Sequence, residues 1–198
     1  MSRARAYAQL VRLPNVFTAL ADIGLAALMS GALPGAWATV LLVAAASACL
    51  YCGGMVWNDY FDVEQDRRER PFRPVPSGRV ARREAAGLGA LLLLGGLVFA
   101  CLAMVVQDAG EVAASLPLRG APVLLASLLI GTILAYDGWL KRTWAGPLGM
   151  GACRFLNVLL GLSAAPQQDW GRALYLALVV GVYIVGVTWF AHTEARAS

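Results

Sequence analysis

The clearest indication of architecture in this chain is the stretch of residues 37–79, WATVLLVAAASACLYCGGMVWNDYFDVEQDRRERPFRPVPSGR. Residues 37–57 contain no charged side chain, and an apolar helix of about 20 residues crosses the ~30 Å hydrocarbon core of a bilayer. Carboxylates follow directly, and arginines interspersed with prolines come next. The stretch therefore predicts a membrane-spanning helix that ends in a charged loop at the membrane surface.

The rest of the chain has the same apolar character. Of its 198 residues, 59% are hydrophobic and 14% are charged, whereas a soluble domain has roughly 25% charged residues. This composition excludes a soluble globular protein. We expect an all-α fold, a polytopic transmembrane helical bundle that forms one domain over residues 1–198. Six spans are predicted, at about 15–33, 36–57, 85–107, 120–136, 146–165 and 173–190.

The basic residues predict the orientation of these spans. Most of the 16 Lys and Arg residues precede the first span or fall in the loops after the second and fourth spans. Outside the spans, only Arg119 and Arg172 fall on the opposite side. The positive-inside rule then places both termini and the two basic loops in the cytoplasm, and we predict an integral protein of the bacterial inner membrane. Because topology accounts for the basicity, no nucleic-acid partner is expected.

The first span, the glycine pairs and the cysteines lead to three further expectations. The apolar run of the first span is longer than that of a signal peptide, which favours a retained helix. The glycine pairs at 53–54 and 95–96 are expected to allow close helix packing. The four cysteines lie in apolar stretches and are interpreted as free thiols, without a disulfide or a zinc site; they are Cys49, Cys52, Cys101 and Cys153.

Four polar groups at the end of the second span form the most informative motif. With 100° per residue, Asn58, Asp59, Asp62 and Asp66 lie along one helical face. Carboxylates at this spacing repel one another, and a bound cation would offset that cost. Oxygen ligands without His or Cys are those that Mg²⁺ prefers, usually together with phosphate oxygens of a substrate. The motif therefore predicts Mg²⁺ as a cofactor.

Arginines on a proline-rich turn follow the acidic motif. Residues 70–79 read RPFRPVPSGR, and guanidinium groups bind phosphate oxygens through two parallel hydrogen bonds. An arginine-rich loop can also be a topology signal, a contact for anionic lipid or a solvated salt-bridge surface. Its position directly after four convergent polar groups favours the phosphate site.

These two motifs together resemble the first signature of the UbiA-type membrane prenyltransferases. The matching patterns are N-D-x-x-D-x-x-x-D at residues 58–66 and R-P-x-R-P-x-x-S-G at residues 70–78. The later runs YDGWLKR at 136–142 and GPLGMGACR at 146–154 are also similar to this family. They are most similar to its branch encoded in bacterial ebo-type metabolite clusters.

The resemblance implies a reaction and a set of residue roles. A polyprenyl diphosphate would lose its diphosphate, and the allylic cation would alkylate an unknown, possibly aromatic, acceptor inside the bundle. The implied Mg²⁺ ligands are Asn58, Asp59, Asp62 and Asp66. The implied diphosphate contacts are Arg67, Arg70, Arg73, Lys141 and Arg142, with Asp59, Asp62 and Lys141 taking part in catalysis.

The resemblance also implies features that the sequence does not match. Family members usually have about nine helices and a second Asp-rich motif after the sixth. The sequence ends just past its sixth span, where Glu194 is the nearest acidic residue, and Asp137 is the other carboxylate on that side. We therefore expect either a truncated form or a loss of three helices. Two further functions stay open, a non-catalytic membrane protein that binds lipid diphosphate and a small transporter.

Two more groups of residues have alternative interpretations. Aromatic residues, among them Tyr51 and Tyr136, gather near the cytoplasmic ends of the spans. They either form an interfacial belt or line the path of the prenyl group, and Tyr136 is a candidate substrate contact. Arg154 and Asn157 share one face of the fifth span. A charge in the membrane faces a cavity or a partner, so they either bind substrate or form a structural pair, with Asp22 of the first span or with the carboxylates of the second.

Overall fold

The computed structural model describes residues 3–33, 35–109, 120–165 and 169–197. Its helices are α1 (Arg3–Leu10), α2 (Val16–Met29), α3 (Trp37–Phe61), α4 (Val63–Glu69), α5 (Arg82–Ala109), α6 (Ala121–Gly138), α7 (Gly146–Leu162) and α8 (Trp170–Ala197). Short 3₁₀ turns occupy Leu13–Asn15 and Leu140–Arg142. Among the described residues there is no strand, and the predicted all-α helical bundle is confirmed.

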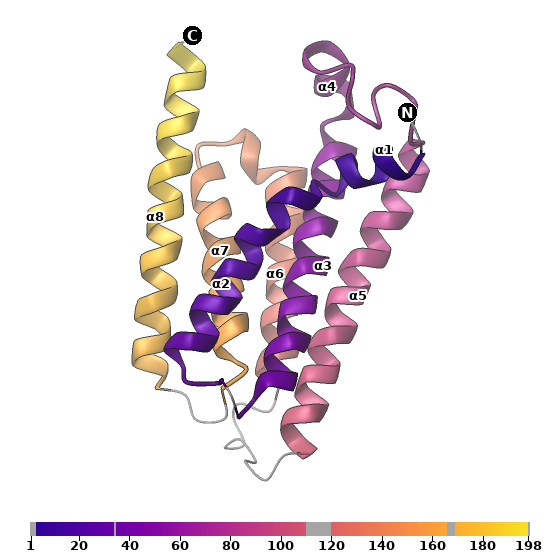
Figure 1. The fold of residues 1–198 in the computed structure, drawn as a ribbon. Helices are drawn as coiled ribbons and strands as arrows, with labels where there is room; N and C mark the ends of the chain where they lie inside the picture. Colours follow the sequence, from indigo (N-terminus) through magenta and orange to yellow (C-terminus); the bar gives the residue numbers. More distant parts are fainter. Residues whose placement is uncertain (1–2, 34, 110–119, 166–168, 198) are drawn as a thin grey trace.

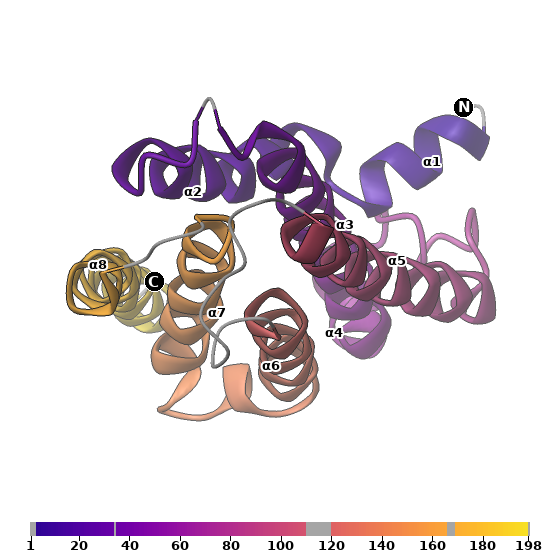
Figure 2. The same ribbon diagram turned by 90° about the horizontal axis from the view of Figure 1, so that it is seen from below.

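The long helices run side by side, and their charged connections gather at one end of the bundle (Figure 1). Both termini, α4 and the connection between α6 and α7 lie at that end, as the positions of the basic residues predicted. In the view from below, α3 lies beside α2 and α5, while α7 lies between α6 and α8 (Figure 2). Helices α3 and α7 therefore each have neighbours on two sides.

The observed helices match the predicted spans in order and position. Five of them are long and apolar enough to cross a membrane, with the first counted over Arg3–Met29. The predicted fifth span corresponds to α7, which is apolar but has only 17 residues, or about 25 Å of helix. Arg119, expected on the opposite side, lies outside the described residues.

The N-terminal segment contains a helix that the apolar pattern did not predict. Helix α1 is separated from α2 by Arg12, whose backbone is left-handed (φ 49°), and by the turn that contains Pro14. It buries Ala6 and Leu10 in a small apolar cluster with residues of α3, α4 and the proline-rich loop, namely Val56, Val63, Val75 and Val80. This cluster anchors the proline-rich loop to the body of the protein.

Close helix packing at glycines agrees with the sequence. A Cβ atom at Gly96 of α5 would lie 3.2 Å from the carbonyl oxygen of Ala46 in α3, and one at Gly53 would meet Leu93. The backbones of α3 and α5 therefore approach each other where a larger residue would not fit. All four cysteines are free thiols, as expected.

Candidate functional site

The acidic motif lies where α3 gives way to α4. Helix α3 ends at Phe61, Asp62 occupies the junction, and α4 begins at Val63. The helical geometry that placed the four polar groups on one face is therefore interrupted at Asp62. The backbone nevertheless keeps a helical spacing, because the amide of Asp62 donates to Asn58 (3.0 Å) and the amide of Asp66 donates to Asp62 (2.8 Å). The four polar side chains thus stay at the same end of the bundle.

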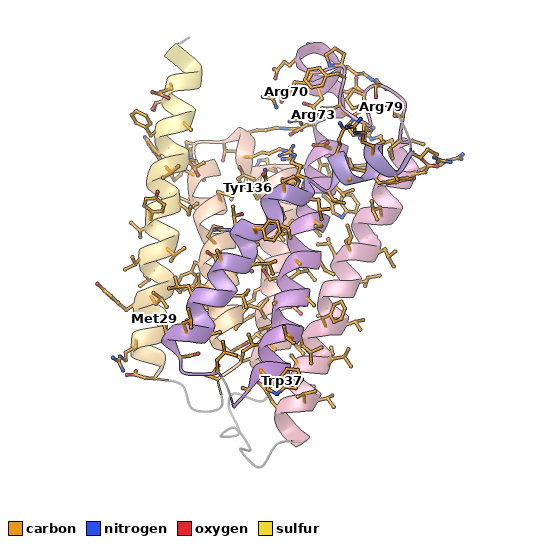
Figure 3. All side chains as sticks on the ribbon, in the orientation of Figure 1. Met29, Trp37, Arg70, Arg73, Arg79 and Tyr136 are labelled. Carbon is orange, nitrogen blue, oxygen red and sulfur yellow. The ribbon has the colours of Figure 1, made fainter. Side chains whose placement is uncertain are left out.

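Arg73 joins two of the carboxylates. Its Nη1 donates to Asp66 (2.7 Å) and to Asp59 (3.2 Å). Both carboxylates are nearly inaccessible to solvent, with 3% of each side chain exposed. Buried charges need such partners. Arg73 lies on the proline-rich loop, above Tyr136 in the view of Figure 3. The structure thus places Arg73, a predicted diphosphate contact, against two carboxylates of the acidic motif.

The connection between α6 and α7 supplies a second basic pair. Lys141 Nζ lies 2.7 Å from Asp62 Oδ2. Arg142 Nη2 donates to the carbonyl oxygen of Phe61 (3.0 Å) and lies 3.4 Å from Asp62 Oδ1. The structure therefore brings both predicted basic residues to the acidic motif, although they are 79 and 80 residues away from Asp62 in the sequence.

Two further residues belong to this cluster and were not among the predicted site residues. Arg12 Nη2 donates to Asp59 (2.9 Å) and lies 3.4 Å from Asn58 Oδ1. Asp137 is buried and accepts a hydrogen bond from Asn58 Nδ2 (3.0 Å). In the sequence, Arg12 was interpreted only as a topology signal and Asp137 only as a weak substitute for a missing motif. The position of Arg12 directly before Leu-Pro-Asn was the feature of the sequence that could have indicated its place in the site.

Two of the predicted phosphate contacts lie outside the cluster. Arg67 forms an exposed pair with Glu64 (2.8 Å), one turn away on the same helix. Arg70 is exposed at the end of α4. Among the described residues, neither side chain contacts the carboxylates of the acidic motif, so the structure does not bring them into the site.

A cavity of about 270 Å³ opens beside this cluster between α2, α3, α6 and α7. At one end it is lined by Arg12, Asn58 and Asp137. Its walls are largely apolar and include Tyr51 and Tyr136, the aromatic residues for which two interpretations were open. Further residues of the walls include Leu50, Met55, Leu129, Ile133, Met150 and Cys153. The two tyrosines therefore line an interior space next to the charged cluster.

The far end of the cavity carries a polar group within the bundle. Arg154 Nη2 lies 3.1 Å from Asp22 Oδ1, and Asn157 Nδ2 donates to Asp22 Oδ2 (3.0 Å). Ser47 of α3 donates to Asn157 Oδ1 (2.6 Å). The pairing of Arg154 and Asn157 with Asp22, one of the two alternatives from the sequence, is present in the structure.

The donor atoms of the charged cluster suit Mg²⁺ in kind. The candidate ligands at residues 58, 59, 62 and 66 all offer oxygen atoms, which Mg²⁺ prefers. No group of three His, Cys, Asp or Glu residues within the described part of the chain is arranged to hold a metal ion. Mg²⁺ commonly takes only one or two carboxylates and completes its coordination with substrate phosphates. The residues therefore fit an ion that binds together with a diphosphate.

Comparison with known proteins identifies the family. The chain is 35% identical over 156 residues to the digeranylgeranylglyceryl phosphate synthase of Ignicoccus hospitalis, covering 73% of this chain and 50% of that protein. It is 33% identical over 151 residues to the enzyme of the same name from Methanothrix thermoacetophila, covering 71% and 54%. The chain thus spans about half the length of these relatives.

A solved structure and a family match agree with these relatives. The structure comes from work on digeranylgeranylglyceryl phosphate synthase in membranes and is similar with a TM-score of 0.80 and 26% identity, covering 98% of this chain and 65% of that one. Residues 16–198 match the description "UbiA prenyltransferase family". The match extends from the start of α2 through the acidic motif to the last helix, and this integral membrane protein belongs to the UbiA prenyltransferase family.

Proposed function

We propose that this protein transfers a polyprenyl group from its diphosphate to an acceptor within the membrane, in a reaction that depends on Mg²⁺. The observation that carries the proposal is the cluster in which Asp59, Asp62 and Asp66 meet basic groups from three separate segments at the mouth of a membrane cavity. Family membership supports the same reaction.

Each part of the cluster has a role in this proposal. Asp59 and Asp62 would hold Mg²⁺, with Asn58 and Asp66 completing the oxygen donors. Arg12, Arg73, Lys141 and Arg142 would bind the diphosphate. Bound Mg²⁺ would supply positive charge to the departing diphosphate. Basic donors fixed where negative charge develops lower the barrier to ionisation.

The cavity accounts for the second half of the reaction. When the C1–O bond of the donor breaks, its electron pair leaves with the diphosphate. The acceptor then forms a bond to C1 and releases a proton. Tyr51 and Tyr136 line the cavity beside the cluster, and aromatic faces stabilise a nearby cation. The apolar walls would keep water away from that cation.

The relatives suggest which acceptor to test first. Their names describe a product with two geranylgeranyl groups on glyceryl phosphate. Removal of one group from that product leaves geranylgeranylglyceryl phosphate, a glycerophosphate lipid, as the acceptor. We propose this class in place of the aromatic acceptor expected from the sequence. Membership of the ebo-type branch and a location in the bacterial inner membrane stay predictions.

Binding of a donor analogue tests the proposal. Purified protein in lipid nanodiscs is titrated with geranylgeranyl thiolodiphosphate, with and without Mg²⁺. We expect saturable, Mg²⁺-dependent binding that is lost in Asp59→Asn plus Asp62→Asn and kept in the control Glu64→Gln plus Glu69→Gln. Binding that ignores both Mg²⁺ and the first pair of changes would contradict the donor site.

Product analysis separates catalysis from the alternative of non-catalytic binding. The protein is incubated with geranylgeranyl diphosphate, geranylgeranylglyceryl phosphate and Mg²⁺, and the lipids are analysed by mass spectrometry. A product with two geranylgeranyl groups supports the transferase. Mg²⁺-dependent donor binding without a product from glycerophosphate or aromatic acceptors would favour a lipid-diphosphate-binding protein. Uptake of label into proteoliposomes without product would favour the transporter.

A further inference from the structure

The polar group at the far end of the cavity lies apart from the basic residues to which the proposed function assigns the diphosphate. It consists of Asp22 of α2, Ser47 of α3, and Arg154 and Asn157 of α7, and we call it the inner polar cluster. Three of these residues, Ser47, Arg154 and Asn157, line the same cavity as Asn58 and Asp137. The inner polar cluster and the diphosphate cluster therefore face one space from two ends.

Hydrogen bonds satisfy most of the inner polar cluster. Asp22 accepts from Arg154 at one oxygen and from Asn157 at the other (3.1 and 3.0 Å). Asn157 also accepts from Ser47 (2.6 Å) and donates to the carbonyl oxygen of Ala19 (3.0 Å). Nη2 of Arg154 also donates to the carbonyl oxygen of Thr18 (3.0 Å). The Asp22 carboxylate and the Asn157 amide thus have partners within the protein, and neither group needs a ligand.

Arg154 has one hydrogen-bond donor that these contacts do not use. Its Nε is buried and has no hydrogen-bond partner among the described residues. Buried N–H groups almost always have a partner, and one that lacks it marks a place for a water or a ligand. The group that the inner polar cluster can still bind is therefore a hydrogen-bond acceptor, such as an oxygen atom.

The charge of the cluster narrows the class of ligand. The guanidinium of Arg154 is already balanced by the Asp22 carboxylate 3.1 Å away, so this end of the cavity carries no net charge to attract an anion. A phosphate would instead favour the other end, where Arg12 lines the cavity, three more basic groups gather and bound Mg²⁺ would add positive charge. The ligand group suited to Arg154 is an uncharged oxygen.

A structural role alone does not account for this arrangement. An ion pair within a membrane is costly, and apolar residues of similar size often stabilise a fold as well as a buried pair does. Helices α2 and α7 already pack closely, because a Cβ at Gly161 of α7 would lie 3.1 Å from the Cα of Ile23 in α2. The ion pair is thus not needed to bring the two helices together.

We propose that the inner polar cluster recognises the prenyl acceptor, and that the partly exposed Arg154 side chain rotates on binding so that Nε donates a hydrogen bond to an uncharged hydroxyl or carbonyl oxygen of that molecule. This inference rests on the proposed prenyl transfer and adds a ligand class to its second substrate. The acceptor then lies in the cavity between Arg154 and the diphosphate cluster, and any anionic group that it carries points toward Arg12.

Binding of an uncharged acceptor probe tests the inference. The probe is 1-O-geranylgeranylglycerol, titrated into the full chain in nanodiscs. Arg154→Lys keeps a positive charge for Asp22, but its single ammonium group cannot replace both the bonds of Nη2 and the donor at Nε. We expect Arg154→Lys to weaken probe binding about tenfold, the effect of about one hydrogen bond. The control Arg83→Lys, an exposed residue of α5, keeps the native affinity.

A second measurement uses the native chain and does not depend on a variant that folds. Cys153 lines the cavity, whereas Cys101 lies on α5 and is not among the lining residues. Alkylation by N-ethylmaleimide is followed at both cysteines by mass spectrometry. We expect the probe to slow the alkylation of Cys153 at least about threefold, by excluding the reagent from the cavity, and to leave Cys101 unchanged.

The outcomes distinguish this inference from the proposed function. Unchanged probe affinity in a folded Arg154→Lys protein, or no protection of Cys153, would overturn the acceptor site. If the thiolodiphosphate still binds with Mg²⁺ in that case, the donor site stands. Loss of thiolodiphosphate binding in Arg154→Lys would assign Arg154 to the donor and would also overturn the inference.

Discussion

Among single residues, Arg73 has the most consequential position. It is the shared partner of Asp59 and Asp66, and both carboxylates are buried. Arg12 also neutralises Asp59, whereas Asp66 has Arg73 as the basic partner described for it. Removal of one partner from a buried pair leaves the other charge without compensation, which costs more than the pair itself contributes.

We therefore expect Arg73→Gln to destabilise the protein by about 3 kcal/mol. The matched control is Arg67→Gln, which breaks the exposed pair with Glu64 and should cost less than about 1 kcal/mol. Thermal unfolding in detergent, followed by circular dichroism, measures both changes. Equal stability of the two variants would show that Arg73 does not compensate buried charge.

The ion pair between Asp22 and Arg154 gives a second prediction for single residues. Asp22→Asn leaves the guanidinium of Arg154 without its counter-charge inside the bundle, and we expect a loss of about 3 kcal/mol or more. Asp22→Asn combined with Arg154→Met removes both charges and should be more stable than Asp22→Asn alone. Unfolding in sodium dodecyl sulfate compares the two variants. A larger loss in the double variant would contradict this coupling.

The sequence predicted part of the site and missed the rest for a physical reason. Asn58, Asp59 and Asp62 could be predicted because they lie within two helical turns of one segment, whereas Arg73, Lys141 and Arg142 were implied by the family resemblance. Arg12 and Asp137 reach the cluster from 47 residues before Asp59 and 79 residues after Asn58. Such contacts depend on how the helices pack, which local spacing does not determine. The same limit explains why Arg67 and Arg70 were included although they point elsewhere.

Among the helices, α7 is packed closely against α8 at Gly151. A Cβ at Gly151 would lie 2.8 Å from the carbonyl oxygen of Gly181 in α8 and would also meet Val185. The two backbones are therefore in direct contact, as small residues permit in membrane helices. This contact holds α8 against the helix that carries Arg154 and Asn157.

Gly151→Ala should separate α7 from α8 and destabilise the protein by about 1–3 kcal/mol, the usual cost of overpacking. Gly131→Ala is the matched control, because a Cβ at Gly131 in α6 would meet nothing within 4 Å. Alanine is also the better helix former, so the control should be as stable as the native protein. Melting temperatures of both variants in the same detergent provide the comparison.

Helix positions were predictable because a hydrocarbon core requires long apolar runs. The spans at residues 36–57, 85–107 and 120–136 correspond closely to α3, α5 and α6. Helix α1 was missed because only two of its eight residues are buried, so it shows no apolar run. The junction at Asp62 was also missed, since its neighbours on both sides are compatible with helix.

For the whole molecule, the charged connections give it two chemically different ends. Both termini, the proline-rich loop and the connection after α6 share one end (Figure 1). The positive-inside rule assigns this end to the cytoplasm. Donor diphosphate would then reach Arg73 and Lys141 from the cytoplasmic side.

Cysteine labelling in intact cells tests this orientation. Single cysteines are placed at exposed positions, Arg68→Cys and Thr193→Cys at the basic end and Asp169→Cys at the opposite end, in a protein whose native cysteines are replaced by alanine. A membrane-impermeant maleimide should label Asp169→Cys from outside. The other two should react only after permeabilisation. Labelling of Arg68→Cys from outside would reverse the orientation.

The pairing of Asp22 with Arg154 also determines how the protein responds to membrane voltage. A single elementary charge that crosses a potential of 100 mV gains or loses about 2.3 kcal/mol. The two opposite charges are 3.1 Å apart and experience nearly the same potential, so the electrical work on one cancels the work on the other. Binding of an uncharged ligand does not change this electrical work. The Asp22–Arg154 pair itself therefore adds almost no voltage dependence to the inner end of the cavity.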